Sequence, residues 1–544
     1  MAMTVTAVSS TAKIYVSGEP RPLTTPVILF TGDVCHLQLA IAGDVRTEEG
    51  VLRFSGGAAA RAIKVNRVGF VPGIYDRLGA DDYYELRDDH IYPDVLETVD
   101  IHHLNTTPGY NLPLFLTIRD SEKIPVGDNT VTVTYLAENG IRAKTSFVIR
   151  KLAARLPEQK SMYTSWMHYD GIFVHHNVRP FSRDFYKVFG SYLDAAVYSG
   201  QTMLLTPIFT PAFDTRVGGE RLTAQLLDIR EDAEGNFSFD FKKLREFVRF
   251  ALAHGIRQLE MPPLFTQWGA KHAPKIMVKG PNGRLRRRFG WDTDALSEDY
   301  RRFLTTLLPQ LVAELRDMGM EENTYFHVSD EPNVAHVEHY RACKGLVMPL
   351  LGDKCRTLDA CGDIEFAGKT PREYVVPVIY RLRPFIEAGV RPLCTYYCCN
   401  PRGDHYPNRL LSMPLSRTVV IGTVFWRHDI ALFLHWGFNF YNSIQSRRPI
   451  SPFNMTDGDW HFPAGDPFIV YPDYAGRGAL LSLRLIATRE SFRLARMLYL
   501  LEEKIGRDAV MEILTAEGVR DLNVYPTEPA WMDEFIVRLA DRLA

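Results

Sequence analysis

The stretch from Tyr325 to Asn333 reads Y-F-H-V-S-D-E-P-N, and it decides the fold. The β-branched and aromatic residues at 324–328 predict a short buried strand. Pro332 has no backbone N–H, so it ends the strand and is expected to push Glu331 toward extended backbone geometry, with Asp330 and Glu331 pointing to different sides. Adjacent carboxylates at the C-terminal end of a strand are typical of catalytic groups in parallel α/β barrels. An isolated D-E-P is more often a solvated turn, so the interpretation depends on the rest of the chain.

The bulk composition is that of a globular protein with more than one core. The 544 residues are 46% hydrophobic and 24% charged, with a net charge of −2, which favours several domains and gives no global attraction to nucleic acid or anionic membranes. The basic run Arg284–Arg288 follows Gly280-Pro281-Asn282-Gly283. We interpret it as an exposed loop at the mouth of a site, either simply solvated or, as the lesser alternative, in contact with an anion or nucleic acid.

Targeting and redox signals favour a reducing compartment. Met1 to Ser10 has no basic region followed by an apolar stretch, and no window is apolar enough to predict a membrane span. Seven cysteines, with Cys394, Cys398 and Cys399 close together, lack the spacing of a disulfide framework or a zinc site. We therefore expect free thiols, no metal, no cofactor and a cytoplasmic location, although a leader could have been removed. Whether the chain forms a homo-oligomer stays open.

The first 155 residues predict an antiparallel β-sandwich, because short alternating runs are separated by turn residues every few positions. The runs Leu114–Ile118 and Thr130–Leu136 are interpreted as a hairpin-linked pair near its end.

From 156 to 505 the pattern changes to strand-like runs that alternate with helical segments, which predicts a parallel sheet. Eight candidate strands favour a (β/α)8 barrel, in which Asp330 and Glu331 follow the fourth strand; a doubly wound open sheet would show the same alternation. The candidate strands are Met162–His168, Thr202–Pro207, Gln258–Pro262, Thr324–Val328, Cys355–Ala360, Tyr374–Ile379, Leu393–Cys398 and Phe433–Tyr441. The candidate helices are Arg183–Tyr198, Phe241–His254, Glu298–Met318, Arg372–Gly389 and Arg477–Lys504, and residues 506–544 form a helical tail.

Aromatic and polar residues gather at the predicted strand ends, which would converge on one face of a barrel. Aromatic faces mixed with amides and carboxylates suit a sugar, whose C–H faces stack while its hydroxyls form hydrogen bonds. For any one of these aromatics, the barrel core is an equally good explanation. The candidate substrate-binding residues are Trp166, His168, Trp268, Asp359, Tyr396, Tyr397, His435, Trp436 and Asn439.

Two carboxylates in such a cleft predict glycoside hydrolysis, by one of three geometries. In two of them the second carboxylate comes from another strand, such as Asp359, either ~5 Å away as a nucleophile or ~6.5–9.5 Å away in an inverting enzyme. In the third, the 2-acetamido oxygen of the substrate attacks the anomeric carbon. Adjacent Asp330 and Glu331 fit this third geometry, with Glu331 as an acid/base whose pKa is raised by burial and by Asp330, and Asp330 as an ionised helper that orients the acetamide. A carbohydrate-binding barrel without catalysis is the alternative from another class.

Several motifs together resemble glycoside hydrolase family 123 and its relatives that carry the domain of unknown function 4091. They cover most of the chain and comprise V-S-D-E-P, Leu358-Asp359-Ala360 with Asp363–Phe366, Cys394–Tyr397, Asn408-Arg409, Phe433–Phe440, Gly465-Asp466 with Val470-Tyr471-Pro472, Ser482–Leu485 with Arg489-Glu490, and upstream Tyr92-Pro93-Asp94 and Leu114–Tyr135.

The resemblance implies a retaining β-N-acetylhexosaminidase, most simply a β-N-acetylgalactosaminidase, that uses substrate assistance. It implies Asp330 as the acetamide-orienting residue and Glu331 as the acid/base, with Tyr396 and Trp436 as acetamide and sugar-stacking contacts. The chain departs from the family pattern at Phe440-Tyr441, where relatives often continue the eighth strand with Trp. Pro281–Phe289 and the tail beyond Gly506 have no counterpart in the relatives. These departures leave the identity of the sugar open.

Overall fold

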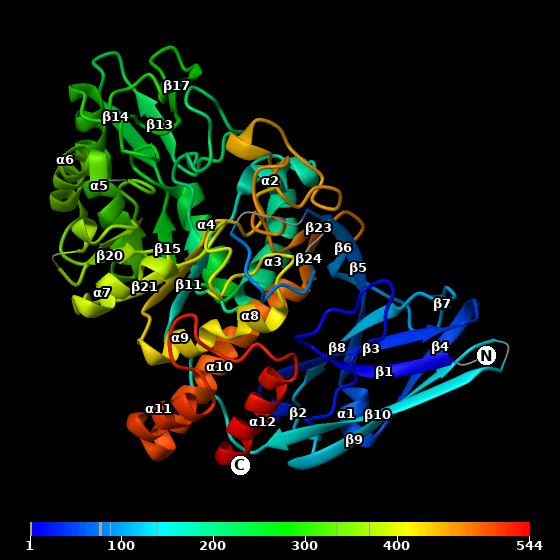
Figure 1. Cartoon of the computed structure of the whole chain (residues 1–544). Helices are drawn as coiled ribbons and strands as arrows, with labels where there is room; N and C mark the ends of the chain where they lie inside the picture. Colours follow the sequence, from blue (N-terminus) through cyan, green and yellow to red (C-terminus); the bar gives the residue numbers. More distant parts are fainter. Residues whose placement is uncertain (1–2, 75–78, 87–88, 139, 333, 369) are drawn as a thin grey trace.

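The computed structural model describes residues 3–74, 79–86, 89–138, 140–332, 334–368 and 370–544 (Figure 1). Asn333, the last residue of the stretch that opened the sequence analysis, lies outside the described residues. The N-terminal part forms two facing sheets that are antiparallel, as predicted, except that β2 pairs parallel with β10. One has the order β1-β3-β8-β5-β6-β24-β23 and the other β2-β10-β9-β4-β7.

The strands of these two sheets are β1 (Met3–Ser9), β2 (Val27–Phe30), β3 (Val34–Gly43), β4 (Thr47–Ser55), β5 (Ile63–Gly73), β6 (His90–Thr98), β7 (Leu104–Thr106), β8 (Leu112–Arg119), β9 (Gly127–Leu136), β10 (Arg142–Leu152), β23 (Tyr471–Asp473) and β24 (Gly478–Ser482), and α1 (Gly57–Arg61) lies between β4 and β5. Alternate residues of β3 and β8 face the core between the sheets, with Leu37 opposite Leu116 and Leu39 opposite Leu114. The predicted hairpin of β8 with β9 is wrong: β8 pairs with β3 and β5, whereas β9 pairs with β4 and β10. Both strands alternate correctly, but their connection crosses from one sheet to the other.

Two strands from the far end of the chain complete the larger sheet. β24 pairs with β6, with Leu481 opposite Leu96, and β23 lies outside β24 (Figure 1). Beside this junction the buried Arg484 guanidinium donates to Asp94 at 2.8 Å, and the Tyr471 hydroxyl donates to the same carboxylate at 2.6 Å. A buried charge pair of this kind tolerates the loss of neither partner. The sandwich and the following unit are therefore joined by a shared sheet and a shared ion pair.

The second unit is the predicted (β/α)8 barrel. Its parallel strands follow chain order around the sheet, and β11 pairs with β22. A bridge between Val378 and Tyr396 links the sixth and seventh strands. The eight strands are β11 (Met162–Ser165), β12 (Met203–Leu205), β15 (Gln258–Met261), β18 (Thr324–Phe326), β19 (Arg356–Ala360), β20 (Glu373–Val376), β21 (Cys394–Tyr396) and β22 (Leu432–His435). Asp330 and Glu331 follow the fourth strand, β18, as predicted.

Helices cover the outside of the barrel (Figure 1). They are α2 (Tyr169–His175), α3 (Arg183–Tyr198), α4 (Lys242–Ala253), α5 (Glu298–Asp317), α6 (Val337–Val347), α7 (Arg383–Glu387), α8 (Leu415–Val419), α9 (Ile421–Arg427) and α10 (Leu483–Ile505). Short 3-10 turns are η1 (Glu321–Asn323), η2 (Val334–His336), η3 (Met348–Leu351), η4 (Ile364–Phe366), η5 (Ile379–Arg381) and η6 (Ile444–Ser446). α3 begins where the Ser182 hydroxyl accepts the Phe185 N–H, and it buries the predicted stripe that includes Phe189 and Tyr192.

Two predicted helices are corrected. Residues 372–389 form β20, η5 and the short α7, because Pro377 and Pro384 divide the segment and its β-branched start pairs with β19. The long helix predicted from Arg477 begins only at Leu483, since the preceding residues form β24. After it, α11 (Arg507–Ala516) and α12 (Trp531–Leu543) form the predicted helical tail, and α12 contacts β2 of the sandwich.

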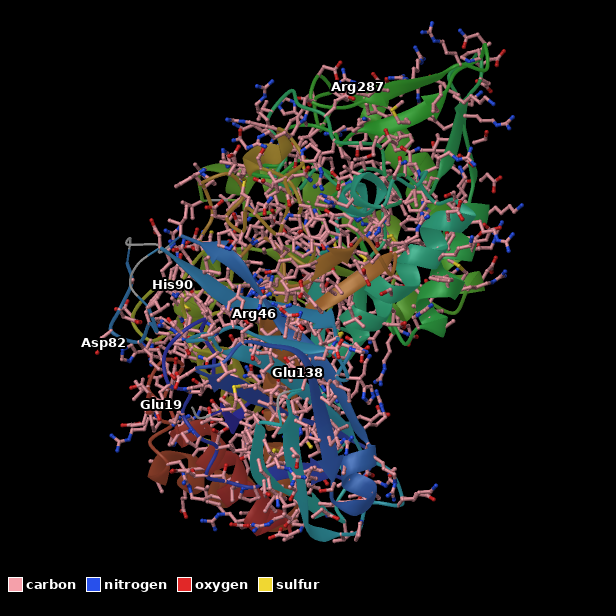
Figure 2. All side chains as sticks on the ribbon, turned by 90° about the vertical axis from the view of Figure 1, so that its right-hand side faces the viewer. Glu19, Arg46, Asp82, His90, Glu138 and Arg287 are labelled. Atoms are coloured by element: carbon pink, nitrogen blue, oxygen red, sulfur yellow. The ribbon has the colours of Figure 1, made fainter. Side chains whose placement is uncertain are left out.

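The basic run is a strand and not a loop. It forms β17 (Leu285–Phe289) in a small sheet of order β14-β13-β16-β17, with β13 (Asp228–Glu231), β14 (Phe237–Asp240) and β16 (Ile276–Lys279). Arg286 and Arg288 both donate to Glu231. Figure 2 shows Arg287 near the top of the view, with the sandwich residues Arg46 and Glu138 well below it. Ion pairs with Glu231 in the sheet therefore account for Arg286 and Arg288, and Arg287 pairs with Glu220 and Asp292.

Candidate active site

A cavity of about 320 Å³ opens at the carboxyl end of the barrel strands, within the size range of small-ligand sites. Its described walls come from β11, β12, β15, β18, β19, β21 and β22 or the residues that follow them, and β20 contributes no described lining residue. Its described lining consists of Trp166, Phe213, Asp214, Gln267, Trp268, Asp330, Glu331, Ala360, Tyr396, Cys398, Cys399, Leu434, Trp436, Ile444, Gln445, His461 and Phe462. Aromatic rings and three carboxyl groups thus share one hollow.

The backbone around the carboxylate pair differs from the sequence-based prediction. Glu331 has φ of +46° and is not extended. Such left-handed geometry costs a residue with a side chain about 1–3 kcal/mol and persists only where neighbours hold it. Here the Glu331 N–H donates to Ala360 O at 3.1 Å, and the Trp268 N–H donates to Asp330 O at 2.9 Å. The neighbouring strand ends therefore fix the pair on both sides.

The two carboxyl groups have different environments. Asp330 is buried, whereas Glu331 is exposed to the cavity and accepts a hydrogen bond from the Tyr396 hydroxyl at 2.8 Å. Burial, followed by the charge of Glu331, raises the pKa of Asp330 well above its usual range. The sequence analysis expected Glu331 to be buried, but the buried carboxyl group is that of Asp330. Burial raises the pKa of Tyr396 as well, so its phenol stays protonated and donates.

A buried charge network lies beneath the pair. His327 Nε2 donates to Glu260 Oε1 at 2.6 Å, and His327 Nδ1 lies 3.5 Å from Asp359 Oδ1. Burial alone would lower the pKa of His327, but the two carboxylates raise it to about 9. The resulting imidazolium is one of the charges that act on Asp330, where it lowers the pKa. Glu260 also accepts the Trp166 indole N–H at 2.7 Å, so the same network holds a cavity wall.

The aromatic walls are rigidly supported. The rings of Trp166 and Phe213 stack with centroids 3.6 Å apart. The Trp436 indole donates to Asp466 Oδ2 at 2.9 Å, and its ring contacts Phe462. Burial raises the pKa of Asp466 to about 7. Trp268 is 41% exposed. Together these rings give the cavity apolar faces of the kind that bind the C–H face of a sugar.

Several predicted sugar contacts lie behind the cavity instead of lining it. Asp359 accepts the N–H groups of Val328 and Ser329 and the Tyr340 hydroxyl, so it holds the loop that carries the pair. The other residues support the strand ends through buried hydrogen bonds and packing. His168 contacts Arg221 and Trp436 O, and Asn439 exchanges two hydrogen bonds with the His168 backbone. His435 contacts Arg409, and Tyr397 packs on Phe433.

Burial and the nearby Arg221 lower the pKa of His168 to about 3. His168 is therefore neutral, accepts at Nδ1 from Arg221 and donates from Nε2 to Trp436 O. It positions the start of the eighth-strand loop without meeting the cavity.

The sequence analysis missed cavity residues that lie on long loops. Asp214 and Phe213 come eight or more residues after β12, and Gln445, His461 and Phe462 lie far beyond β22. No local pattern marks such residues, because a loop brings them back over the barrel only in three dimensions. Gln267 stood near Trp268 at a predicted strand end and carried the one available signal. Cys398 and Cys399 are free thiols, as predicted, with sulfur atoms 3.6 Å apart.

Comparison with known families identifies the family of the chain. The family description "Glycoside hydrolase 123, catalytic domain" matches residues 166–501, which include every barrel strand except β11. The chain belongs to glycoside hydrolase family 123. The matched family 123 segment contains all the residues that line the cavity, and it extends into α10. A carbohydrate substrate and hydrolysis of a glycosidic bond therefore follow from the family.

A solved structure agrees with this family 123 fold. A family 123 glycoside hydrolase from Clostridium perfringens, described in a study of glycolipid glycan hydrolysis, has a TM-score of 0.74 at 14% identity, covering 100% of this chain and 97% of the other. A xyloglucanase from Bacteroides ovatus (TM-score 0.30, 9% identity, 87% and 99% covered) and a glycoside hydrolase of unassigned activity from Bacteroides vulgatus (0.24, 10%, 88% and 79%) are only distantly similar. No curated protein sequence matches the chain.

One group among the described residues has the arrangement of metal ligands: Asp81, Asp82 and His405. It lies outside the described cavity lining, and Arg417 donates to both oxygens of Asp81. Of the helices in the described ranges, none has the length and apolarity that a membrane crossing requires.

Proposed function

We propose that this family 123 glycoside hydrolase releases β-linked N-acetylhexosamine, with N-acetylgalactosamine as the sugar, by retaining, substrate-assisted catalysis. The galacto configuration rests on the family resemblance. The observation that carries the mechanism is the adjacent carboxyl pair, in which buried Asp330 lies above a cationic His327 and exposed Glu331 is held by Tyr396.

In the first step the acetamido carbonyl oxygen of the substrate attacks C1 and the bond from C1 to the leaving oxygen breaks. The Glu331 carboxyl donates its proton to that oxygen. The Asp330 carboxylate accepts the acetamide N–H, which orients the attacking group and stabilises the positive charge that develops on the oxazolinium ring. The ring of Trp436 supports the apolar face of the sugar.

In the second step a water molecule attacks C1 from the side that the leaving group vacated. The Glu331 carboxylate takes a proton from this water, and the bond between C1 and the acetamido oxygen breaks. Two inversions at C1 give net retention, and Glu331 ends protonated for the next cycle. Exposure of Glu331 to the cavity suits both roles, because it must meet the leaving group and the water.

The location of the proton changes when substrate binds. In the empty site the raised pKa of Asp330 favours the proton on Asp330. In the proposed mechanism an acetamide N–H pointing at Asp330 favours its ionised form, with the His327 cation beneath. Only an acetamido sugar supplies this N–H, so the proposed role of Asp330 depends on that class of substrate.

The main alternative, a separate carboxylate nucleophile at Asp359, finds little support. Both Asp359 oxygens accept hydrogen bonds from the protein, and the residue does not line the cavity. Freeing it for attack on a sugar would leave two backbone N–H groups and the Tyr340 hydroxyl without their acceptor.

The test compares paired aryl β-glycosides, 2-acetamido against 2-hydroxyl, in the galacto and gluco series. We expect turnover of the acetamido sugars alone, fastest in the galacto series, and tight inhibition by a thiazoline analogue of the acetamido sugar. Glu331→Gln should lower kcat by about 10²- to 10⁴-fold, whereas Glu338→Gln, exposed on α6, should leave it unchanged. Comparable turnover of the 2-hydroxyl sugars would refute the proposed nucleophile.

A further inference from the structure

Asp214 is a carboxylate in the cavity that the proposed reaction does not use. It follows β12, lines the cavity and is separated along the barrel from the Asp330/Glu331 pair by the end of β15. Its Oδ2 accepts the Gln445 N–H at 2.8 Å. Within the described part of the chain, its Oδ1 has no hydrogen-bond partner. The Gln445 N–H therefore fixes the orientation of the Asp214 carboxylate, and Oδ1 remains available to accept a hydrogen bond from a ligand.

Gln267 is its counterpart. Its Oε1 accepts the Asp214 N–H at 2.7 Å, and its Nε2 is buried without a hydrogen-bond partner among the described residues. The side chain cannot be turned over, because Nε2 would then face the Asp214 N–H, another donor. Gln267 is only 6% exposed. A buried amide donor without a partner costs free energy unless a ligand satisfies it.

The loop geometry that brings these groups together is costly and well supported. Asp214 has φ of +39°, and its carbonyl accepts the Ser446 hydroxyl at 2.8 Å. Thus the loop after β12 is tied to the end of β15 through Gln267 and to the loop after β22 through Gln445 and Ser446. A strained backbone held from two sides is typical of a binding position.

We propose that Asp214 and Gln267 form a hydroxyl-recognition pair that selects the sugar. A sugar hydroxyl both donates and accepts, so one hydroxyl can donate to Asp214 Oδ1 and accept from Gln267 Nε2. This inference rests on the proposed function for its orientation. With C1 and the 2-acetamido group at Asp330 and Glu331, the pair faces the hydroxyls at C3, C4 or C6, which distinguish one hexosamine from another.

The charge of Asp214 strengthens this recognition. Burial raises the pKa of Asp214 to about 6, so the carboxylate, the stronger acceptor, forms above that pH. The groups that face it are the Gln445 N–H and the more distant Arg221, both of which favour the charged form. Recognition should therefore weaken as the pH falls below about 6.

The experiment measures kcat/KM for the parent aryl β-N-acetylhexosaminide and its 3-, 4- and 6-deoxy analogues. The enzymes are the wild type, Asp214→Asn, Gln267→Met and the control Asp508→Asn, which lies exposed on α11. For the wild type we expect kcat/KM to be about 10- to 100-fold lower for one deoxy analogue than for the parent, because that analogue lacks a hydrogen bond to a charged group. In Asp214→Asn and Gln267→Met, kcat/KM for the parent glycoside should fall by the same factor. Removing the hydroxyl from the substrate should then lower kcat/KM of these variants little further. The control should match the wild type.

A second readout separates this inference from the proposed reaction. Trp166, Trp268 and Trp436 line the cavity, so their fluorescence reports sugar binding directly. Binding of N-acetylhexosamines that weakens about tenfold in Asp214→Asn, without hydrolysis of any glycoside, would support the recognition pair and overturn the reaction. Hydrolysis or binding that is unchanged in both Asp214→Asn and Gln267→Met would overturn the recognition pair and leave the reaction standing.

Discussion

His327 offers the sharpest test of the electrostatics beneath the catalytic pair. Its folded pKa of about 9 lies above the ordinary value of 6.5. Protonation therefore stabilises the folded state below about pH 6.5, and this contribution is lost as the pH rises through about 9. At about 1.4 kcal/mol for each pKa unit, the difference corresponds to about 3 kcal/mol. His327→Gln keeps a donor toward Glu260 but cannot become a cation.

The assay is urea unfolding of the wild type and His327→Gln from pH 6 to pH 10, followed by both fluorescence and circular dichroism so that coincident transitions can be verified. Near pH 6 the variant should be less stable by about 3–5 kcal/mol, because Glu260 and Asp359 lose the cation between them. This deficit should shrink by about 3 kcal/mol toward pH 10, where the wild type loses its proton too. His103→Gln, in an exposed ion pair with Asp100, should differ from the wild type by less than about 1 kcal/mol. A deficit that is the same at pH 6 and pH 10 would refute the buried imidazolium.

Two further predictions address the site and the junction of the two units. Tyr396→Phe removes the hydroxyl that donates to Glu331, so kcat for the acetamido glycoside should fall about tenfold with little change in KM; steady-state kinetics decide, and an unchanged kcat would exclude a role for that hydrogen bond. Asp94→Asn leaves Arg484 buried without its carboxylate, so the free energy of unfolding should drop by about 3–5 kcal/mol, whereas the exposed Asp128→Asn should cost less than about 1 kcal/mol in the same urea titration.

The barrel could be predicted because its strands and helices differ in the spacing of their apolar residues, and that spacing changes regularly along the chain. The cavity residues could be predicted only in part, because a strand end displays residues to opposite sides in turn. Tyr396 faces the cavity and Tyr397 the helix layer, and Trp436 likewise faces inward beside an outward His435. The interior residues Leu358 and Ala360 show the same parity around Asp359. This alternation separates Asp359, Tyr397 and His435 from the lining. It fails beyond the strands, because adjacent Asp330 and Glu331 both line the cavity, whereas His168 has the parity of Trp166 but does not.

Other errors came from interactions that no local pattern contains. Glu331 adopts a positive φ because Ala360 O, on the next strand, accepts its N–H. Asp214 enters the cavity because Gln267 and Gln445 hold its loop from both sides. In each case a tertiary contact outweighs the local preference of the residue, and the cost is concentrated where a ligand would bind.

β23 and β24 follow the barrel in the chain but belong to a sheet of the N-terminal sandwich, and this affects where the protein can be truncated. β23 and β24 fall inside the family-matched residues 166–501, but β24 pairs with β6, near residue 95, as well as with β23. A fragment cut to the family limits would keep β23 and β24 and lose β6, which exposes a row of unpaired backbone groups on β24. The fragment would also lack Asp94, so the buried guanidinium of Arg484 would have no carboxylate partner there. Such a fragment is expected to aggregate, and studies of the isolated catalytic unit would need the N-terminal strands supplied in the same polypeptide or in trans.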